Sequence, residues 1–241
     1  MRVIIAGWRS VSLVDVKGAT SFTIWLCGCN LRCPFCHNWR IADRDPKLCR
    51  GVDVDTVVEE LEASAALVDY LHVTGGEPLL QADALVELFR KARKLGVGAS
   101  LNSNLTLPGE LEKVVDLVDH VATDLKVPWA MYGVPGWEEL YGRFLQSLKL
   151  VAEKGVVLEL RVPVARLPAE WYAKIFEDVA SVLRQHGRAH VVFNKVLGRP
   201  VVEPRDKKWC EKHCLSDEEF ETYVHNLKAL VKENKLTTSP P

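Results

Sequence analysis

The sequence contains no apolar segment close to the roughly 20 residues that a helix needs to cross a bilayer. The apolar run that begins at Val3 is interrupted by Arg9, and it is too short for the hydrophobic region of a secretory signal peptide. We therefore expect a cytoplasmic protein with no membrane partner.

Neither sign of charge is in excess, because 31 Lys and Arg residues face 32 Asp and Glu residues, for a formal net charge of -1. A balanced charge creates no overall field that would attract nucleic acid, so we expect no nucleic-acid partner. The sequence also lacks internal repeats and low-complexity linkers. A single domain is the simplest organisation, and 241 residues are enough for a complete core.

The cysteines do not form an even set. There are seven, and three of them lie within eight positions, between Cys29 and Cys36. A secreted disulfide framework has an even number of spaced cysteines, whereas a close group of three is typical of metal binding.

Short β-rich segments alternate with amphipathic helical segments along most of the chain. This alternation implies βαβ crossovers and a parallel sheet. Six such units are too few for a closed eight-stranded barrel, so the sequence predicts an α/β fold of the partial (β/α)6 TIM-like barrel type. The predicted strands are residues 20–27, 70–74, 98–102, 120–124, 156–162 and 189–194. Residues 20–27 are expected to form the first core strand.

The partial barrel is predicted to span residues 1–197. Residues 198–236 are expected to form a small C-terminal helical appendage of the same domain, with Ser216 and Glu219 as a capping box at its last helix. Residues 237–241 are expected to be a disordered tail.

Three cysteines follow the first predicted strand as Cys29-x3-Cys33-x2-Cys36. Soft thiolates select iron–sulfur clusters, zinc or Cu(I). A four-iron cluster on three cysteines leaves one iron without a protein ligand. Structural zinc normally takes a fourth ligand, for which His37 is available, although its adjacency to Cys36 makes the chelate geometry awkward.

A second motif, Gly75-Gly76-Glu77-Pro78, follows the second predicted strand. The two glycines allow backbone to approach a ligand closely, and the Glu77 carboxylate can accept a hydrogen bond from an ammonium group. Taken alone, the segment could be a tight turn. In barrel-like folds the active site lies on the loops after the strands, where both motifs fall.

The cysteine spacing, with Phe35 before the last cysteine, resembles the radical S-adenosylmethionine (SAM) superfamily, and residues 75–78 resemble its loop that binds the SAM amino group. The resemblance implies a [4Fe–4S] cluster on Cys29, Cys33 and Cys36, with SAM bound to the open iron. One electron would then cleave SAM to methionine and a 5′-deoxyadenosyl radical. The expected protein is therefore an enzyme, with catalysis at the cluster and cofactor contacts from Phe35 and the 75–78 loop.

Within this superfamily the chain resembles the activating proteins of glycyl-radical enzymes. Asp124 and Lys126 match an Asp-x-Lys element in which the Asp binds a cation near SAM and the Lys contacts the SAM carboxylate. Arg161 matches a further SAM contact. From the residues alone, a surface ion pair between Asp124 and Lys126 and a solvent-facing Arg161 remain alternatives.

The resemblance implies a protein substrate, the glycyl-radical enzyme partner, from which a backbone glycine hydrogen is abstracted, and an electron donor of the flavodoxin or ferredoxin type. The resemblance is incomplete at two places. The family's Asp-Thr-Asn-Gly stretch is replaced by residues 102–105, so that Asn102 stands in place of the Asp of the cation site. Asn194 and Lys195 stand where the family has a SAM-contacting His.

Two other functions remain open. One is a radical SAM enzyme for a small molecule, such as a carboxy-deazaguanine synthase; those enzymes have a hydroxyl side chain soon after the last cysteine, where this chain has His37 and Asn38. The other is a non-enzymatic electron-transfer or zinc module, which would need neither SAM nor Glu77.

The sequence assigns no role to Cys27, Cys49, Cys210 and Cys214. Buried thiols are the favoured interpretation, above all for Cys27 in the first predicted strand. A second metal site and a Cys210–Cys214 disulfide are the alternatives, since residues four apart on a helix lie within disulfide range.

Overall fold

The computed structural model describes residues 1–183 and 188–238, and the chain divides into two compact units. The first unit comprises Met1–Asn30 and Arg40–Ala122, and the second comprises Leu31–Trp39 and Thr123–Pro241. The cysteine motif is shared between them, because Cys29 belongs to the first unit and the other two cysteines to the second. The predicted domain boundary after residue 197 does not coincide with this division and stays a prediction.

An antiparallel hairpin with one added strand forms one side of the sheet in the first unit. Strand β1 (Arg2–Val16) pairs with β2 (Ala19–Leu26) and with β3 (Arg50–Asp53). The strand predicted at residues 20–27 is confirmed as β2, but it is not the first strand of the chain, because β1 precedes it. Its register shifts against β2 between Ile5 and Gly7 and again further along, which removes the regular alternation that would have identified it.

The remaining strands of the first unit are parallel, as the sequence predicts. Strand β2 pairs with β4 (Tyr70–Gly75), β4 with β5 (Gly98–Asn102), and β5 with β6 (His120–Asp124). Parallel strands place their carboxyl ends at one edge of the sheet, so the segments after β2, β4 and β5 share that edge.

A row of buried polar side chains crosses these strands. His72 on β4 and His120 on β6 each place Nδ1 2.8 Å from the Ser100 hydroxyl on β5, and all three side chains are buried. Because a one-residue slip would leave these polar groups buried without partners, the row fixes the register of the three strands.

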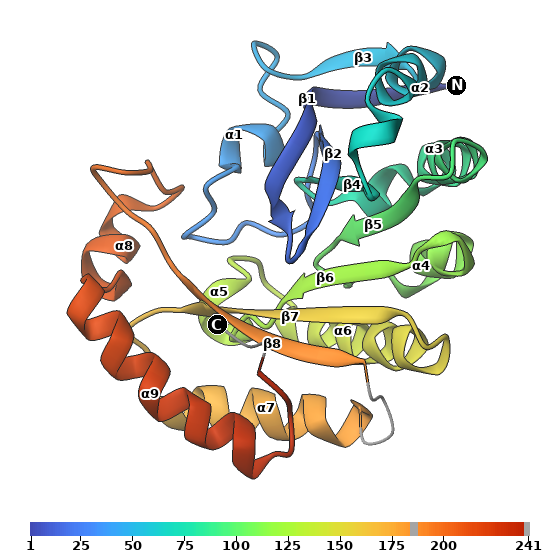
Figure 1. Ribbon diagram of the computed structural model, residues 1–241. Helices are drawn as coiled ribbons and strands as arrows, with labels where there is room; N and C mark the ends of the chain where they lie inside the picture. The colour runs from blue at the N-terminus through green and yellow to red at the C-terminus, as the bar shows by residue number, and fades with distance from the viewer. Residues whose placement is uncertain (184–187, 239–241) are drawn as a thin grey trace. The chain divides into compact units, whose positions relative to one another are not determined.

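Helices α2 (Val54–Glu62), α3 (Ala82–Lys94) and α4 (Pro108–Val114) lie beside the sheet of the first unit (Figure 1). Each buries an apolar stripe, with Leu85, Leu88 and Phe89 in the core on α3. The short elements are α1 (Trp39–Ala42) and the 3₁₀ helices η1 (Ala65–Leu67), η2 (Pro78–Gln81) and η3 (Val115–Leu117).

The second unit is built on the parallel pair β7 (Val157–Val164) and β8 (Ala189–Lys195). Helix α6 contacts α7, α7 contacts α9, and α9 contacts both strands (Figure 1). The helices of this unit are α5 (Pro128–Met131), α6 (Trp137–Glu153), α7 (Ala169–Leu183), α8 (Lys207–His213) and α9 (Asp217–Glu233). Among the described residues, no helix is long and apolar enough to span a membrane.

The C-terminal part agrees with the prediction except at its end. The capping box of Ser216 and Glu219 is confirmed at the start of α9. The prediction of a disordered tail is wrong for Thr237 and Thr238. The carbonyl of Thr237 accepts a hydrogen bond from Val191 N at 2.7 Å, and Thr238 forms a β-bridge with the same residue. Residues 239–241 lie outside the described part of the chain.

The four cysteines outside the motif form two disulfides, Cys27–Cys49 and Cys210–Cys214. The favoured prediction of buried thiols is therefore wrong, as is the alternative of a second metal site. The four-residue spacing of Cys210 and Cys214 indicates a possible disulfide within a helix, but no spacing indicates the Cys27–Cys49 disulfide. Its two cysteines lie 22 residues apart and meet only because residues 40–49 return to the end of β2.

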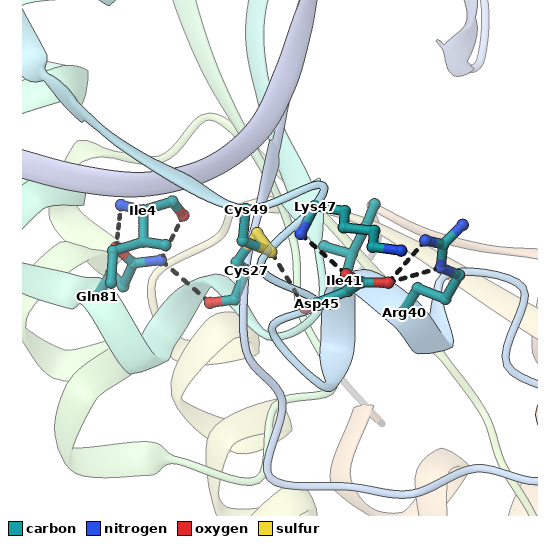
Figure 2. Close-up of a disulfide and its surroundings, with 8 residues drawn as sticks. All are labelled: Ile4, Cys27, Arg40, Ile41, Asp45, Lys47, Cys49 and Gln81. Atoms are coloured by element: carbon teal, nitrogen blue, oxygen red, sulfur yellow. Dashed lines mark hydrogen bonds and ion pairs between the residues drawn. A yellow bond between two sulfur atoms is a disulfide. The ribbon is translucent and has the colours of Figure 1, made fainter.

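Figure 2 shows how the Cys27–Cys49 bridge is placed. The Gln81 side chain donates to the carbonyls of Ile4 and Cys27, at 2.9 and 3.3 Å. Cys27 N also donates to the Ile4 carbonyl at 3.0 Å. The backbone two residues before Cys29 is therefore fixed by a covalent bond and by hydrogen bonds.

Removing the Cys27–Cys49 bridge with Cys49→Ala should lower the free energy of unfolding by about 3 kcal/mol, the size expected for a loop of this length. The measurement is urea unfolding without reductant. Added reductant should lower the wild type at least as far as the variant, because it opens both disulfides. A matched Cys214→Ala variant, which opens a much shorter loop, should lose less. Equal unfolding midpoints for Cys49→Ala and the wild type would contradict the assignment.

Candidate functional site

The loop after β4 runs against the end of β2. Gly76 N donates to the Leu26 carbonyl at 2.8 Å, and Glu77 N donates to the Gly28 carbonyl at 2.7 Å. A Cβ at Gly75 would lie 2.3 Å from the Leu26 carbonyl oxygen, and one at Gly76 would lie 2.0 Å from that of Gly28. Both glycines are thus required by backbone contact, and this contact sets the loop directly beside the chain that leads into Cys29.

The Glu77 carboxylate is fully buried. Its Oε1 accepts hydrogen bonds from Leu79 N at 3.0 Å and from the Ser103 hydroxyl at 2.7 Å, and its Oε2 accepts one from Asn104 N at 2.7 Å. The carboxylate therefore joins the β4 loop to the β5 loop. Its predicted bond with the SAM ammonium group stays a prediction.

Cys29, Cys33 and Cys36 are the three cysteines outside the disulfides; Cys33 is buried and the other two are half-buried. Burial raises the pKa of the Cys36 thiol, against the backbone hydrogen bond of Asn38 and the positive charge of Arg205. A thiol of this kind loses its proton when it binds a metal, because the bound cation stabilises the thiolate.

Phe35 is buried and packs on Trp209 of α8, with ring centroids 5.8 Å apart. The carbonyl of Pro34 accepts a hydrogen bond from Asp206 N at 2.8 Å. The C-terminal appendage therefore supports the second half of the cysteine loop, within the second unit.

The number of cysteines outside the disulfides fits an iron–sulfur cluster better than structural zinc. Disulfides occupy the four other cysteines, so a fourth thiolate is not available. His37 is exposed, and its Nε2 lies 3.3 Å from the Leu197 carbonyl oxygen, so it is engaged by backbone in the second unit. Cys29, Cys33 and Cys36 are the residues that would hold the cluster.

Asp124 and Lys126 form an ion pair at 2.9 Å after β6. Burial disfavours the charged form of both side chains, but the hydrogen bond between them and the opposite charges around each together have the larger effect on its pKa. The positive charge of Lys126 holds the pKa of Asp124 below its usual range, and the negative charge of Asp124 raises that of Lys126. Only 10% of the Lys126 side chain is exposed, whereas 35% of the Asp124 side chain is, so the lysine is largely buried and the aspartate is half-buried.

Arg161 lies within β7 and not at its end, and its side chain is only 16% exposed. Its Nε donates to Glu159 Oε1 at 2.5 Å, and its carbonyl accepts from Leu125 N at 2.7 Å. The alternative of a solvent-facing arginine is therefore wrong. Backbone contact brings Arg161 to the segment between Asp124 and Lys126.

The role of Ser103 and Asn104 is not evident from the sequence. There, residues 102–105 are only a departure from the family pattern. The structure shows that Ser103 and Asn104 bind the Glu77 carboxylate, while Asn102 donates to the Thr74 hydroxyl at 3.1 Å. The signal available in the sequence was a run of short polar side chains after a buried strand, on the same sheet edge as both motifs.

Gly76→Ala should lower the free energy of unfolding by about 1–3 kcal/mol or more, because the added Cβ meets backbone that cannot turn away. Gly142→Ala is the matched control. Gly142 lies inside α6 with nothing within 4 Å of its added Cβ, so alanine should stabilise the helix by roughly 0.5–1 kcal/mol. Chemical denaturation of both variants tests the difference in sign. A Gly76→Ala variant as stable as the wild type would contradict the close approach.

Comparison with known proteins agrees with this geometry. The family model of the radical SAM superfamily matches residues 23–163, which contain both motifs and the Asp124–Lys126 pair. A spore photoproduct lyase structure with bound AdoMet is similar in fold, with a TM-score of 0.67 and 12% identity, over 95% of this chain and 76% of that one. The α/β elements and this likeness confirm the predicted partial-barrel fold class.

Two relatives have different names. A Methanocaldococcus jannaschii protein, named provisionally as a glycyl-radical enzyme activating enzyme, is 28% identical over 76% of this chain and 77% of its own length. A 7-carboxy-7-deazaguanine synthase of Hyperthermus butylicus is 30% identical over 71% of this chain and 77% of its own length. With the family model covering more than half of the residues, the chain belongs to the radical SAM superfamily and is an enzyme of SAM-dependent radical chemistry.

Proposed function

We propose that this enzyme generates a glycyl radical on a partner protein. The observation that carries the proposal is the similarity to the activating enzyme of M. jannaschii, which extends over 191 residues. The Asp124–Lys126 pair supports it, because its spacing is one of the features by which the sequence resembles the activating proteins.

The cofactors in this proposal are a [4Fe–4S] cluster on Cys29, Cys33 and Cys36 and the cosubstrate SAM. When bound, the cluster supplies one electron that cleaves SAM and yields a 5′-deoxyadenosyl radical able to remove a hydrogen atom. A flavodoxin or ferredoxin in the cytoplasm would supply the electron.

The chain's own residues would bind and orient SAM. We assign the backbone of Gly75 and Gly76 and the carboxylate of Glu77 to the side that receives the amino group. Lys126 and Arg161 are two cations that would attract the SAM carboxylate, and Asp124 holds Lys126 in its charged form. Phe35 would pack beside the cofactors.

A second candidate is a small-molecule radical SAM enzyme, favoured by the similarity to the synthase of H. butylicus at 30% identity. The two candidates share SAM cleavage and differ in the acceptor of the radical. Cys36-His37-Asn38, without the early hydroxyl residue expected of the synthases, favours the protein acceptor.

The test supplies the anaerobically reconstituted enzyme with SAM, reductant and a glycyl-radical enzyme from the same genome. We expect 5′-deoxyadenosine together with a glycyl radical signal on the partner, detected by electron paramagnetic resonance (EPR). A parallel reaction supplies the substrate of the 7-carboxy-7-deazaguanine synthases in place of the partner protein. Formation of 7-carboxy-7-deazaguanine there, with no radical signal on any partner, would exclude the activase and establish the second candidate.

Cys33→Ala should abolish 5′-deoxyadenosine formation, because it removes a cluster ligand. The double variant Cys210→Ala/Cys214→Ala is the matched control, since it also replaces cysteines but leaves the motif intact. Product is measured by chromatography after quenching. Undiminished cleavage by Cys33→Ala would contradict the assignment of the cluster ligands.

A further inference from the structure

The segment after β5 places a side-chain amide beside a sulfur of the cysteine motif. Asn104 Nδ2 lies 3.9 Å from Cys29 Sγ, in the geometry of an N–H group that donates to sulfur. Both residues belong to the first unit, so the contact does not depend on how the chain continues into the second.

The orientation of the Asn104 amide is set by its neighbours. Its Oδ1 accepts from Thr106 N at 3.0 Å and from the Thr106 hydroxyl at 2.6 Å. Its Nδ2 also donates to Asn30 Oδ1 at 2.9 Å, while Asn30 Nδ2 donates to the Thr106 hydroxyl at 2.7 Å. A backbone N–H can only donate, so the atom facing Thr106 N is the oxygen, and the amide nitrogen is the atom directed at Cys29.

The backbone of the same segment is held in an uncommon shape. Leu105 has φ of +56° although it is not glycine, and its side chain is fully buried. Leu105 N donates to the Ser103 hydroxyl at 2.9 Å, and that hydroxyl in turn donates to Glu77. Residues held in such conformations are often functional, because the surrounding structure must over-determine them. Here the conformation lets one segment bind both the Glu77 carboxylate and Cys29.

We propose that Asn104 is a positioning residue for the cluster: its amide donates a hydrogen bond to the Cys29 thiolate and raises the reduction potential, while Asn30 and Thr106 hold the amide in place. When the cluster gains one electron, negative charge on its cysteine sulfurs increases. A fixed donor stabilises the reduced form more than the oxidised form. The proposal rests on the three-cysteine cluster of the proposed function.

The test is an EPR-monitored redox titration of the full chain, reconstituted anaerobically, as wild type and as Asn104→Leu. At a fixed ambient potential, the ratio of reduced to oxidised cluster should fall by up to about tenfold in the variant, equivalent to ~59 mV for a one-electron couple. A ratio unchanged within about twofold, at equal iron content, would overturn the proposal.

Two further variants keep the test decisive if Asn104→Leu does not take up iron. Asn104→Asp keeps the size of the side chain but cannot donate to sulfur. Thr106→Val leaves Asn104 in place and removes the hydroxyl that orients it. Both should shift the potential in the same direction, Thr106→Val by less, and unchanged potentials in both would overturn the proposal. Asn226→Asp, on the exposed part of α9, is the matched control and should not shift it.

This result is separable from the proposed function. A wild type that binds no iron would refute the proposed function, and the present inference with it. Normal iron content and normal SAM cleavage with unaltered potentials in the variants would refute only the role of Asn104.

Discussion

The candidate site depends on the contact between the ends of β2 and β4, where two backbones run too close for any side chain between them. Gly75 and Gly76 permit the contact, and hydrogen bonds to the carbonyls of Leu26 and Gly28 maintain it. The backbone directly after β2, which leads into Cys29, is positioned by this contact. The Cys27–Cys49 disulfide fixes the same stretch of backbone covalently.

Charge and hydrogen bonding then complete each unit separately. In the first unit, the buried Glu77 carboxylate accepts hydrogen bonds from Leu79 in its own loop and from Ser103 and Asn104 in the loop after β5. These bonds satisfy the buried carboxylate and hold the two loops together. In the second unit, Asp124 and Lys126 keep each other charged although burial disfavours both charges. A pair of this kind is costly to bury and is often found where a charged ligand is bound.

Much of the fold could be predicted from the sequence, because six strands carry continuous β-branched or apolar runs and helical stripes separate them. Strand β1 could not, since its bulges break the alternation that identifies a strand. The Cys27–Cys49 bridge also could not, because a disulfide between distant cysteines depends on tertiary structure. Thr237 and Thr238 are ordered by pairing with β8, which a polar, proline-ended tail does not indicate.

Some residues of the candidate site could be identified from the sequence, whereas others depend on the tertiary structure. The assignment of Cys29, Cys33 and Cys36 to a cluster rests on the motif spacing and stays a prediction. The partners of Glu77 were not predicted, since Ser103 and Asn104 reach it only through the parallel register of β4 and β5. Arg161 was assigned to a strand end, whereas it lies within β7 and is paired with Glu159.

The proposed chemistry requires that three thiolates hold a four-iron cluster with one iron left for SAM. The most direct measurement is the EPR spectrum of the reduced, anaerobically purified protein before and after SAM is added, together with its iron and zinc content. We expect a four-iron cluster whose spectrum changes when SAM binds. Zinc in place of iron, or an iron signal that SAM leaves unaltered, would contradict it.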